Sequence, residues 1–338
     1  MTVYSTVHTP VGVLGTGSFL PERVVPNELA ALPAGVTADW IERKTGIRER
    51  HHAAAHEATS DLAAEAAVRA LENSGTAPEQ LDWIIVATST PDHPQPATAA
   101  LLQHRIGAFR AAAFDVNAVC AGFVAALHTG ALLCAGTGVA VDGRVLVVGA
   151  ETYSRIVDPT DRRTAPLFGD GAGAVVLGPV AEGGGVLGTG LATDSRFHDL
   201  IGVPAGGSRL PASDKTVAAG DHYFRMRGRE VREYVLRELP TAVRELLRAF
   251  DVGPEDVDHF VPHQANGAML KDLLEPLGLP RARAHLPVTH HANTGAASIP
   301  LALDEAHRSG LLRRGELVVL AGFGGGMTLG TALLRWTG

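Results

Sequence analysis

The chain has 338 residues, of which 46% are hydrophobic and 19% are charged. This composition excludes a wholly disordered protein, because the apolar surface available for burial can outweigh the entropy lost on ordering. The formal net charge of −7 excludes the global basic excess that is typical of a nucleic-acid-binding protein. Two cysteines, Cys120 and Cys134, are too few for a disulfide framework or a four-cysteine zinc site.

Short runs of Val, Ile and Leu bounded by glycine predict buried strands, and alanine-rich segments between them predict helices. Strands are expected in the first half at 11–14, 83–88, 145–148 and 174–177, with partners in the second half. Helices are expected at 60–74, 97–106, 120–135 and 229–250. This alternation predicts a layered α/β fold, with residues 206–220 as a mobile loop.

Residues 116–141 contain no Asp, Glu, Lys or Arg, and a stretch of this length could cross a membrane. Asn117 and His128 interrupt the stretch, and no cluster of Lys or Arg flanks it. We therefore predict a buried helix at the centre of a soluble protein and no membrane association. Residues 1–10 lack a basic region followed by an apolar run, so we expect no signal peptide and a cytoplasmic location.

The sequence resembles itself at an offset of about half its length. The segment GVLGTG at 12–17 recurs at 185–190, an offset of 173. Residues 78–86 resemble residues 254–262, and the segment beginning at Gly143 resembles the one beginning at Gly315. These nearly equal offsets predict two duplicated halves, 1–178 and 179–338, that share one core.

The two halves differ by an insertion in the first. The Phe-Gly-Asp-Gly segment at 168–171 matches Phe-Gly-Gly-Gly at 323–326 with an offset of only 155, so the first half holds 17 extra residues near 151–167. An insertion between matched strands is typical of a loop used in binding or assembly. A neutral surface loop is the alternative interpretation.

Cys120 stands where a β-like run ends and a long apolar helix begins. Free backbone N–H groups and the positive end of a helix dipole lower the pKa of a thiol at such a position. The small neighbours Ala121 and Gly122 leave room for an acyl chain. A buried structural cysteine is an equally good interpretation of Cys120 taken alone, and Cys134 is expected to lie in the core.

Two segments of the second half favour an active site. His263 ends a predicted strand, where the active sites of α/β proteins gather. Asn293 opens another helix and lies 173 residues after Cys120, which is the offset of the repeat. Duplicated halves would place Cys120 and Asn293 at equivalent helix starts across a pseudo-twofold axis. The glycine run at 322–328 lacks the Lys-Ser/Thr of a phosphate loop and predicts an oxyanion hole instead.

At these residues the chain resembles the β-ketoacyl-acyl-carrier-protein synthases III of the thiolase superfamily. The matching segments run in family order and are 40–50, the Cys120 segment, 167–174, 263–266, 293–300 and 322–328. The resemblance implies a five-layered αβαβα thiolase fold built from two duplicated halves, and a homodimer. It also implies a CoA thioester as substrate, with no metal and no redox cofactor.

The resemblance implies a role for each matched residue. Cys120 would take an acyl group from acyl-CoA, and His263 and Asn293 would bind the thioester carbonyl of malonyl-acyl carrier protein during decarboxylation. Backbone N–H groups of Cys120 and Gly325 would form the oxyanion hole. The reaction would begin fatty-acid or polyketide chains.

The same resemblance predicts the residues that bind substrate. Those expected along the CoA and pantetheine tunnel are Trp40, Lys44, Arg227, Gly228, Arg229, Arg232, Asn266 and Phe323. Lys44 replaces a family arginine and lacks its planar stacking surface. Gln95 stands where many members place a phenylalanine that limits the acyl pocket across the dimer. Gly267 and Ala268 stand where many members have a basic residue that docks the carrier protein.

Three functions remain open from the sequence. The Cys-His-Asn set favours a condensing enzyme, whereas the altered docking residues favour an acyltransferase that moves a starter acyl group to a carrier, hydroxyl or amine without decarboxylation. The third is a non-catalytic partner subunit. The arginine cluster at 225–232 indicates either a docking patch for CoA phosphates or an acidic carrier protein, or a solvated helix face.

Overall fold

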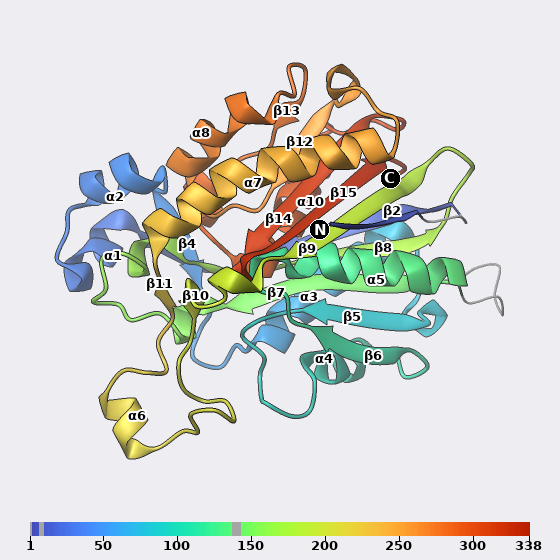
Figure 1. Cartoon of the computed structure of the whole chain (residues 1–338). Helices are drawn as coiled ribbons and strands as arrows, with labels where there is room; N and C mark the ends of the chain where they lie inside the picture. The colour runs from blue at the N-terminus through green and yellow to red at the C-terminus, as the bar shows by residue number, and fades with distance from the viewer. Residues whose placement is uncertain (1, 7–9, 137–142) are drawn as a thin grey trace.

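The computed structural model describes residues 2–6, 10–136 and 143–338, and two large sheets dominate it (Figure 1). The first sheet has the order β2-β8-β7-β5-β6 and the second has the order β1-β9-β15-β14-β12-β13. The strands of the first sheet are β2 (Val11–Phe19), β5 (Trp83–Ala87), β6 (Ala112–Val116), β7 (Val145–Thr152) and β8 (Asp170–Pro179). Those of the second are β1 (Val3–Thr6), β9 (Gly185–Thr193), β12 (His259–Pro262), β13 (Arg283–Ala284), β14 (Leu317–Gly324) and β15 (Thr328–Arg335).

The two sheets have the same topology once β1 is set aside. In the first, β5 runs parallel to β6 and β7, and β8 is antiparallel to β7 and β2. In the second, β12 runs parallel to β13 and β14, and β15 is antiparallel to β14 and β9. The repeat in the sequence is therefore a repeat of strand order and direction, as predicted for a duplicated α/β fold.

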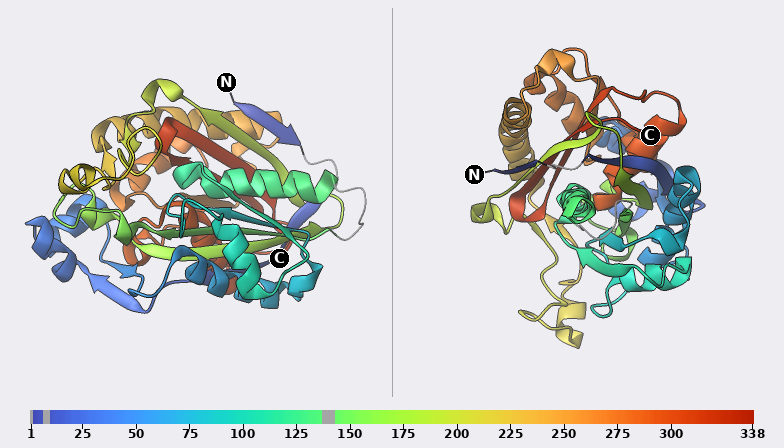
Figure 2. Two further views of the ribbon diagram at one scale, coloured as in Figure 1. Left: turned by 90° about the horizontal axis from the view of Figure 1, so that it is seen from below. Right: turned by 90° about the vertical axis from the view of Figure 1, so that its right-hand side faces the viewer.

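Helices complete five layers (Figure 2). Their bounds are α1 (Asn27–Ala34), α2 (Ala38–Thr45), α3 (Thr59–Ser74), α4 (Thr98–Ile106), α5 (Gly122–Gly136), α6 (Asp214–Ala218), α7 (Gly228–Ala249), α8 (Gly267–Leu277), α9 (Val288–His291) and α10 (Ser298–Arg308). Helices α3 and α4 cover the outer face of the first sheet, α5 and α10 lie between the sheets, and α7 with α8 covers the second. Two small sheets pair β3 (Arg23–Pro26) with β4 (Glu49–His52) and β10 (Ile201–Gly202) with β11 (Arg225–Met226).

The uncharged stretch of the sequence forms the central helix α5. Val119–Gly136 is long and apolar enough to cross a membrane by length and composition alone. In the fold, however, α5 packs against strands of both sheets, and its Phe123, Val124 and Leu127 side chains are buried. This agrees with the predicted core helix, although residues 137–141 of the stretch lie outside the described ranges.

Several strands are longer than the sequence predicted because glycines inside them were interpreted as strand ends. Strand β2 continues through Gly15 and Gly17 to Phe19. A Cβ atom at Gly17 would lie 2.4 Å from the Ala66 carbonyl oxygen and 2.4 Å from the Ala70 nitrogen. Glycine in this strand therefore permits close approach of α3 rather than a turn.

Residues 206–220 form a small lobe with α6 that projects from the body of the molecule (Figure 1). The side chain of Ser213 caps α6, and most residues of the lobe are exposed. The mobility expected for this segment stays a prediction.

We expect Gly17→Ala to lower the free energy of unfolding by about 1–3 kcal/mol, because the new methyl group would overlap the backbone of α3. Gly207→Ala is the control, since a Cβ atom there meets no described atom within 4 Å. The control should change the free energy by less than about 0.5 kcal/mol. Urea unfolding measures both, and equal stability of the two variants would contradict the packing.

Candidate active site

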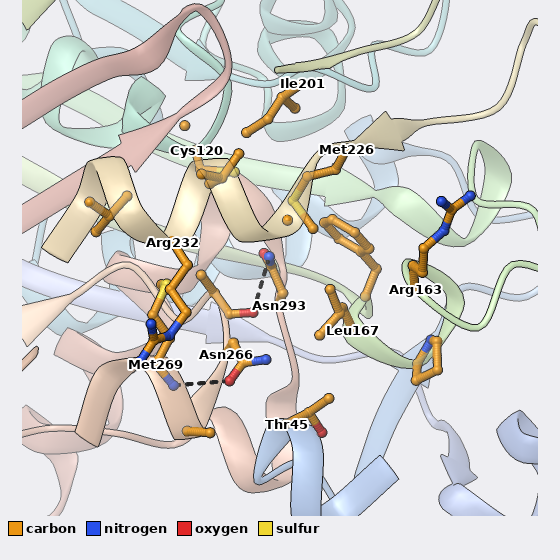
Figure 3. Close-up of a pocket in the computed structure, with 18 of the residues that line it drawn as sticks. Thr45, Cys120, Arg163, Leu167, Ile201, Met226, Arg232, Asn266, Met269 and Asn293 are labelled. Atoms are coloured by element: carbon orange, nitrogen blue, oxygen red, sulfur yellow. Dashed lines mark hydrogen bonds between the residues drawn. The ribbon is translucent and has the colours of Figure 1, made fainter. Parts of the chain in front are cut away.

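A cavity of about 350 Å³ opens between the two halves and reaches Cys120 (Figure 3). All three residues expected to be catalytic, Cys120, His263 and Asn293, line it, although they come from segments far apart in the chain. Of the residues expected to bind CoA, those that also line the cavity are Trp40, Lys44, Gly228, Arg232, Asn266 and Phe323. The fold therefore gathers most of the predicted site in one place.

Left-handed backbone surrounds this cavity at residues other than glycine. The φ angles are 48° at Val119, 57° at Ala292 and 50° at Met327. These residues lie next to Cys120, next to Asn293 and at the end of the glycine loop. A positive φ is a marked outlier for a β-branched residue such as valine, and such strain clusters at functional sites.

Cys120 lies in a 3-10 turn, Val119–Ala121, ahead of the first residue of α5. Burial, together with the nearby Glu151 carboxylate, raises the pKa of the thiol to about 12, whereas a hydrogen bond with Tyr153 lowers it in part. The sequence predicted a lowered pKa from the helix dipole. Burial outweighs that effect, because a thiolate here would lose its hydration. The resting thiol is therefore protonated at neutral pH.

The imidazole of His263 is also kept neutral. Burial lowers its pKa to about 3, and a backbone hydrogen bond with Gly295 opposes this shift in part. The Nδ1 atom lies 2.7 Å from Ser298 Oγ, which also accepts a hydrogen bond from the Gln264 amide at 3.2 Å. We assign the tautomer in which the Ser298 hydroxyl group donates a hydrogen bond to Nδ1 and the imidazole hydrogen is on Nε2. His263 then offers a donor without a charge.

The Asn293 side chain is oriented by its neighbours. Its Oδ1 accepts a hydrogen bond from the Gly295 amide at 2.9 Å, and its Nδ2 donates to the Ala265 carbonyl oxygen at 3.5 Å (Figure 3). The backbone N–H of Asn293 donates to Leu167, and its carbonyl oxygen accepts from Gly169. Because the amide oxygen is already engaged, the amide group offers N–H to a ligand in the cavity.

The glycine loop packs directly on Cys120. A Cβ atom at Gly324 would lie 2.7 Å from the Cys120 nitrogen and 3.0 Å from its Cβ atom. Any larger residue would push the loop away from the thiol. Gly324 lines the cavity, whereas Gly325, expected in the oxyanion hole, is buried beside Val119. The role of the Gly325 amide stays a prediction.

Three predicted substrate residues do not line the cavity. The Arg227 guanidinium lies 2.6 Å from Asp199 and 3.6 Å from Glu230, so it faces a separate hollow beside the 206–220 lobe. Arg229 is exposed on the first turn of α7. Gln95 is exposed on the loop before α4, and its expected role across a dimer stays a prediction.

The sequence missed two cationic residues of the cavity. Arg162 and Arg163 line it together with Pro166 and Leu167 (Figure 3). All four come from the inserted segment 151–167. The 17 extra residues of the first half therefore indicated a segment that forms this wall of the cavity. The repeat alone did not predict which of their side chains would face the cavity.

The arginine cluster on β11 and α7 is paired with the protein's own acids. Arg225 lies 2.8 Å from Asp221, and Arg232 lies 2.6 Å from Asp272 on α8. With Arg227 also paired, most of the positive charge of the cluster is locally compensated.

In the described part of the chain, no group of three or more His, Cys, Asp or Glu side chains could hold a metal ion.

A buried thiol, a neutral imidazole and a carboxamide that line one cavity between duplicated α/β halves define a condensing enzyme of the thiolase fold. Comparison with known proteins gives its family. Sequence models of 3-oxoacyl-[acyl-carrier-protein] synthase III match residues 114–195 and, for its C-terminal part, residues 247–336.

The chain is 54% identical to an acetoacetyl CoA synthase of Streptomyces sp. strain CL190 over 326 residues, 96% of this chain and 98% of the relative. It superposes on the 3-oxoacyl-(acyl carrier protein) synthase III of Pseudomonas aeruginosa PAO1 with a TM-score of 0.87 and 39% identity, covering 97% and 99% of the two chains. The priming β-ketosynthase of the R1128 polyketide pathway gives a TM-score of 0.90 at 32% identity, covering 97% and 96%.

The chain therefore belongs to the β-ketoacyl-acyl-carrier-protein synthase III family of condensing enzymes. This confirms the resemblance, the thiolase fold and the function class predicted from the sequence. It also confirms that the protein is an enzyme that transfers acyl groups.

Buried neutral histidines make the fold sensitive to acid. Burial lowers the pKa of His263 to about 3 and those of His285 and His291 to about 4, whereas an unfolded histidine titrates near 6.5. The unfolded chain therefore binds more protons below pH ~6.5, and stability falls as the pH drops from that value toward 4.

We expect the free energy of unfolding in urea to fall by at least about 2 kcal/mol between pH 7 and pH 4.5. His285→Gln should reduce this fall, because the amide cannot titrate and still offers His259 a polar partner. An unchanged stability over this range would show that the three histidines are not kept neutral by the fold.

Proposed function

We propose that the protein joins an acyl group to a malonyl thioester by decarboxylative condensation. Cys120 attacks the acyl-CoA carbonyl, and CoA leaves as a thiol that takes up the proton of Cys120. His263 Nε2 and the Asn293 amide then donate hydrogen bonds to the malonyl thioester oxygen. As CO2 departs, they stabilise the enolate, whose carbon attacks the acyl-Cys120 carbonyl and displaces the Cys120 thiolate, which takes up a proton from water.

One observation carries this proposal: three buried groups, a thiol and two neutral N–H donors, line one cavity. Uncharged donors suit an oxygen that becomes negative only during the reaction, because they need no reorganisation when the charge forms. Backbone N–H groups of Cys120 and Gly325 are the donors for the second oxyanion, the one formed on the acyl carbonyl. The packing of Gly324 on the Cys120 backbone supports this assignment.

We further propose that CoA carries the malonyl unit. Lys44 and Arg162 line the cavity and suit the phosphates of CoA, whereas Arg163, which also lines it, is paired with Asp161 at 3.1 Å. Arg225, Arg227 and Arg232, expected to dock either CoA phosphates or a carrier protein, are paired with acids of this chain. Ala268 lines the cavity where many members of the family have a basic residue that docks the carrier protein. The relative called an acetoacetyl CoA synthase supports the same choice.

Malonyl-acyl carrier protein, which the sequence resemblance implied, is the donor to compare with malonyl-CoA. Acyl transfer without decarboxylation is the second reaction to test, because it needs Cys120 but not Asn293. The homodimer, the cytoplasmic location and a reaction without metal or redox cofactor also stay predictions.

The division of labour between thiol and donors can be tested on single variants. We expect Cys120→Ala to abolish acyl loading from acyl-CoA. Asn293→Ala should leave loading within about threefold but slow CO2 release by about 10²–10³, the usual loss for one oxyanion donor. Intact-mass spectrometry measures the acyl-enzyme, and trapped CO2 measures decarboxylation. Normal CO2 release by the Asn293 variant would refute its assignment.

The carrier of the malonyl unit can be tested at Ala268. We expect the wild type to condense acetyl-CoA with malonyl-CoA at least about tenfold more efficiently than with malonyl-acyl carrier protein. Ala268→Arg should raise kcat/KM for the carrier-protein substrate severalfold, because one basic side chain is added to the mouth of the cavity. Ala268→Gln is the uncharged control. A wild-type preference for the carrier protein would reverse the proposal.

A further inference from the structure

A second cavity, of about 300 Å³, shares a wall with the active-site cavity, because Phe168 lines both. It lies between α1, the β3–β4 ribbon and the inserted segment 151–167. None of the residues expected to be catalytic lines it, and Phe168 is the one described residue that the two cavities have in common. The reaction therefore leaves this second cavity without a role.

The Arg50 guanidinium borders the second cavity and has no acidic partner. Its Nη1 donates to the Val25 carbonyl oxygen at 3.2 Å, and its Nη2 donates to Asn27 Oδ1 and the Pro166 carbonyl oxygen, both at 2.9 Å. All three acceptors are neutral, and Nε has no hydrogen-bond partner among the described residues. Arg50 is 0% exposed, and burial lowers its pKa to about 10, so it stays charged at neutral pH. A buried cation of this kind favours a negative group nearby, and water screens its charge little.

Two further basic side chains line the same cavity. Arg23 on β3 pairs in register with His52 on β4, and Arg23 is exposed, with no ion-pair partner in the described part of the chain. Burial lowers the pKa of His52, so its imidazole is mainly neutral near pH 7. The described lining includes no acidic side chain. The buried Asp170 carboxylate acts on His52 but is held by Ser154 and by the Ala53 amide, and it does not line the cavity.

The rest of the lining is apolar. It includes Val25 on β3, Leu29 on α1, and Val157 and Ala165 of the inserted segment. A volume of about 300 Å³ is at the small end of the range for ligand pockets in proteins. An inorganic anion would leave these apolar walls uncovered, whereas an anion with a short alkyl tail would cover them.

We propose that the second cavity is a binding site for a short-chain monocarboxylate. The carboxylate pairs with Arg23 in the positive field of Arg50, and the alkyl tail packs on the apolar wall. Because Phe168 lines both cavities and Arg50 holds the Pro166 carbonyl group, the ligand contacts the wall of the active-site cavity without occupying it. The inference goes beyond the proposed condensation and does not depend on it.

The test is direct binding of hexanoate, measured by isothermal titration calorimetry without any thioester. Wild type is compared with Ala30→Phe, which fills the second cavity from α1. Leu32→Phe is the matched control on the same helix, because Leu32 is 76% exposed and does not line the cavity. Ala268→Phe controls for the active-site cavity, which Ala268 lines. Hexanamide is the uncharged probe of the same length.

We expect wild type, Leu32→Phe and Ala268→Phe to bind hexanoate with a Kd below about 1 mM, an affinity within reach of a ligand of this size. Ala30→Phe should weaken binding at least about tenfold, because the ring overlaps the ligand. Arg23→Gln should weaken it about two- to fivefold, the usual contribution of an exposed ion pair. Hexanamide should bind wild type at least about tenfold more weakly than hexanoate, because it lacks the charge.

Three results would overturn the inference. The first is a wild type that binds no hexanoate, or binds hexanamide equally well. The second is equal affinity of wild type and a folded Ala30→Phe protein. The third is binding that Ala268→Phe abolishes and Ala30→Phe keeps, which would place the carboxylate in the active-site cavity. If Ala30→Phe does not fold, Ala165→Leu fills the same cavity and decides by the same criterion. Failure of the condensation rejects the proposed function but leaves this measurement unaffected, because no thioester takes part.

Discussion

Close backbone contact between the two halves is the constraint on which the rest of the site depends. Phe168 and Asn293 form a β-bridge across the halves, and their neighbours Leu167 and Gly169 exchange hydrogen bonds with the Asn293 backbone. Gly324 lies against the Cys120 backbone with no room for a side chain. Because Cys120 lies in the first half and His263 and Asn293 lie in the second, the packing of the two halves at this junction sets the positions of the three side chains relative to one another.

Burial at the junction explains the charge state of the resting site. The same loss of hydration raises the pKa of the Cys120 thiol and lowers that of the His263 imidazole, so both groups are neutral. In the proposed reaction, the new negative charge forms on the substrate oxygens, to which fixed N–H donors are directed. These donors can stabilise the enolate without first having to expel water from a charged side chain.

The insertion in the first half supplies part of the cavity wall. It contributes Arg162 and Arg163, of which Arg163 is paired with Asp161, and the proposed function assigns Arg162 to the phosphates of a CoA thioester. It also contributes Tyr153, which forms a hydrogen bond with the Cys120 thiol.

Much of this architecture was readable from the chain alone, because a repeat and its offset survive in the sequence. The offset between Cys120 and Asn293 predicted that they would meet, and the insertion at 151–167 predicted a binding loop. Contacts across the fold had no such signature. Pairs such as Arg232 with Asp272 and Tyr153 with Ser89 join positions whose spacing follows no period. Burial, which reversed the expected pKa shift of Cys120, is likewise a property of everything packed around a residue, so only the folded chain decides it.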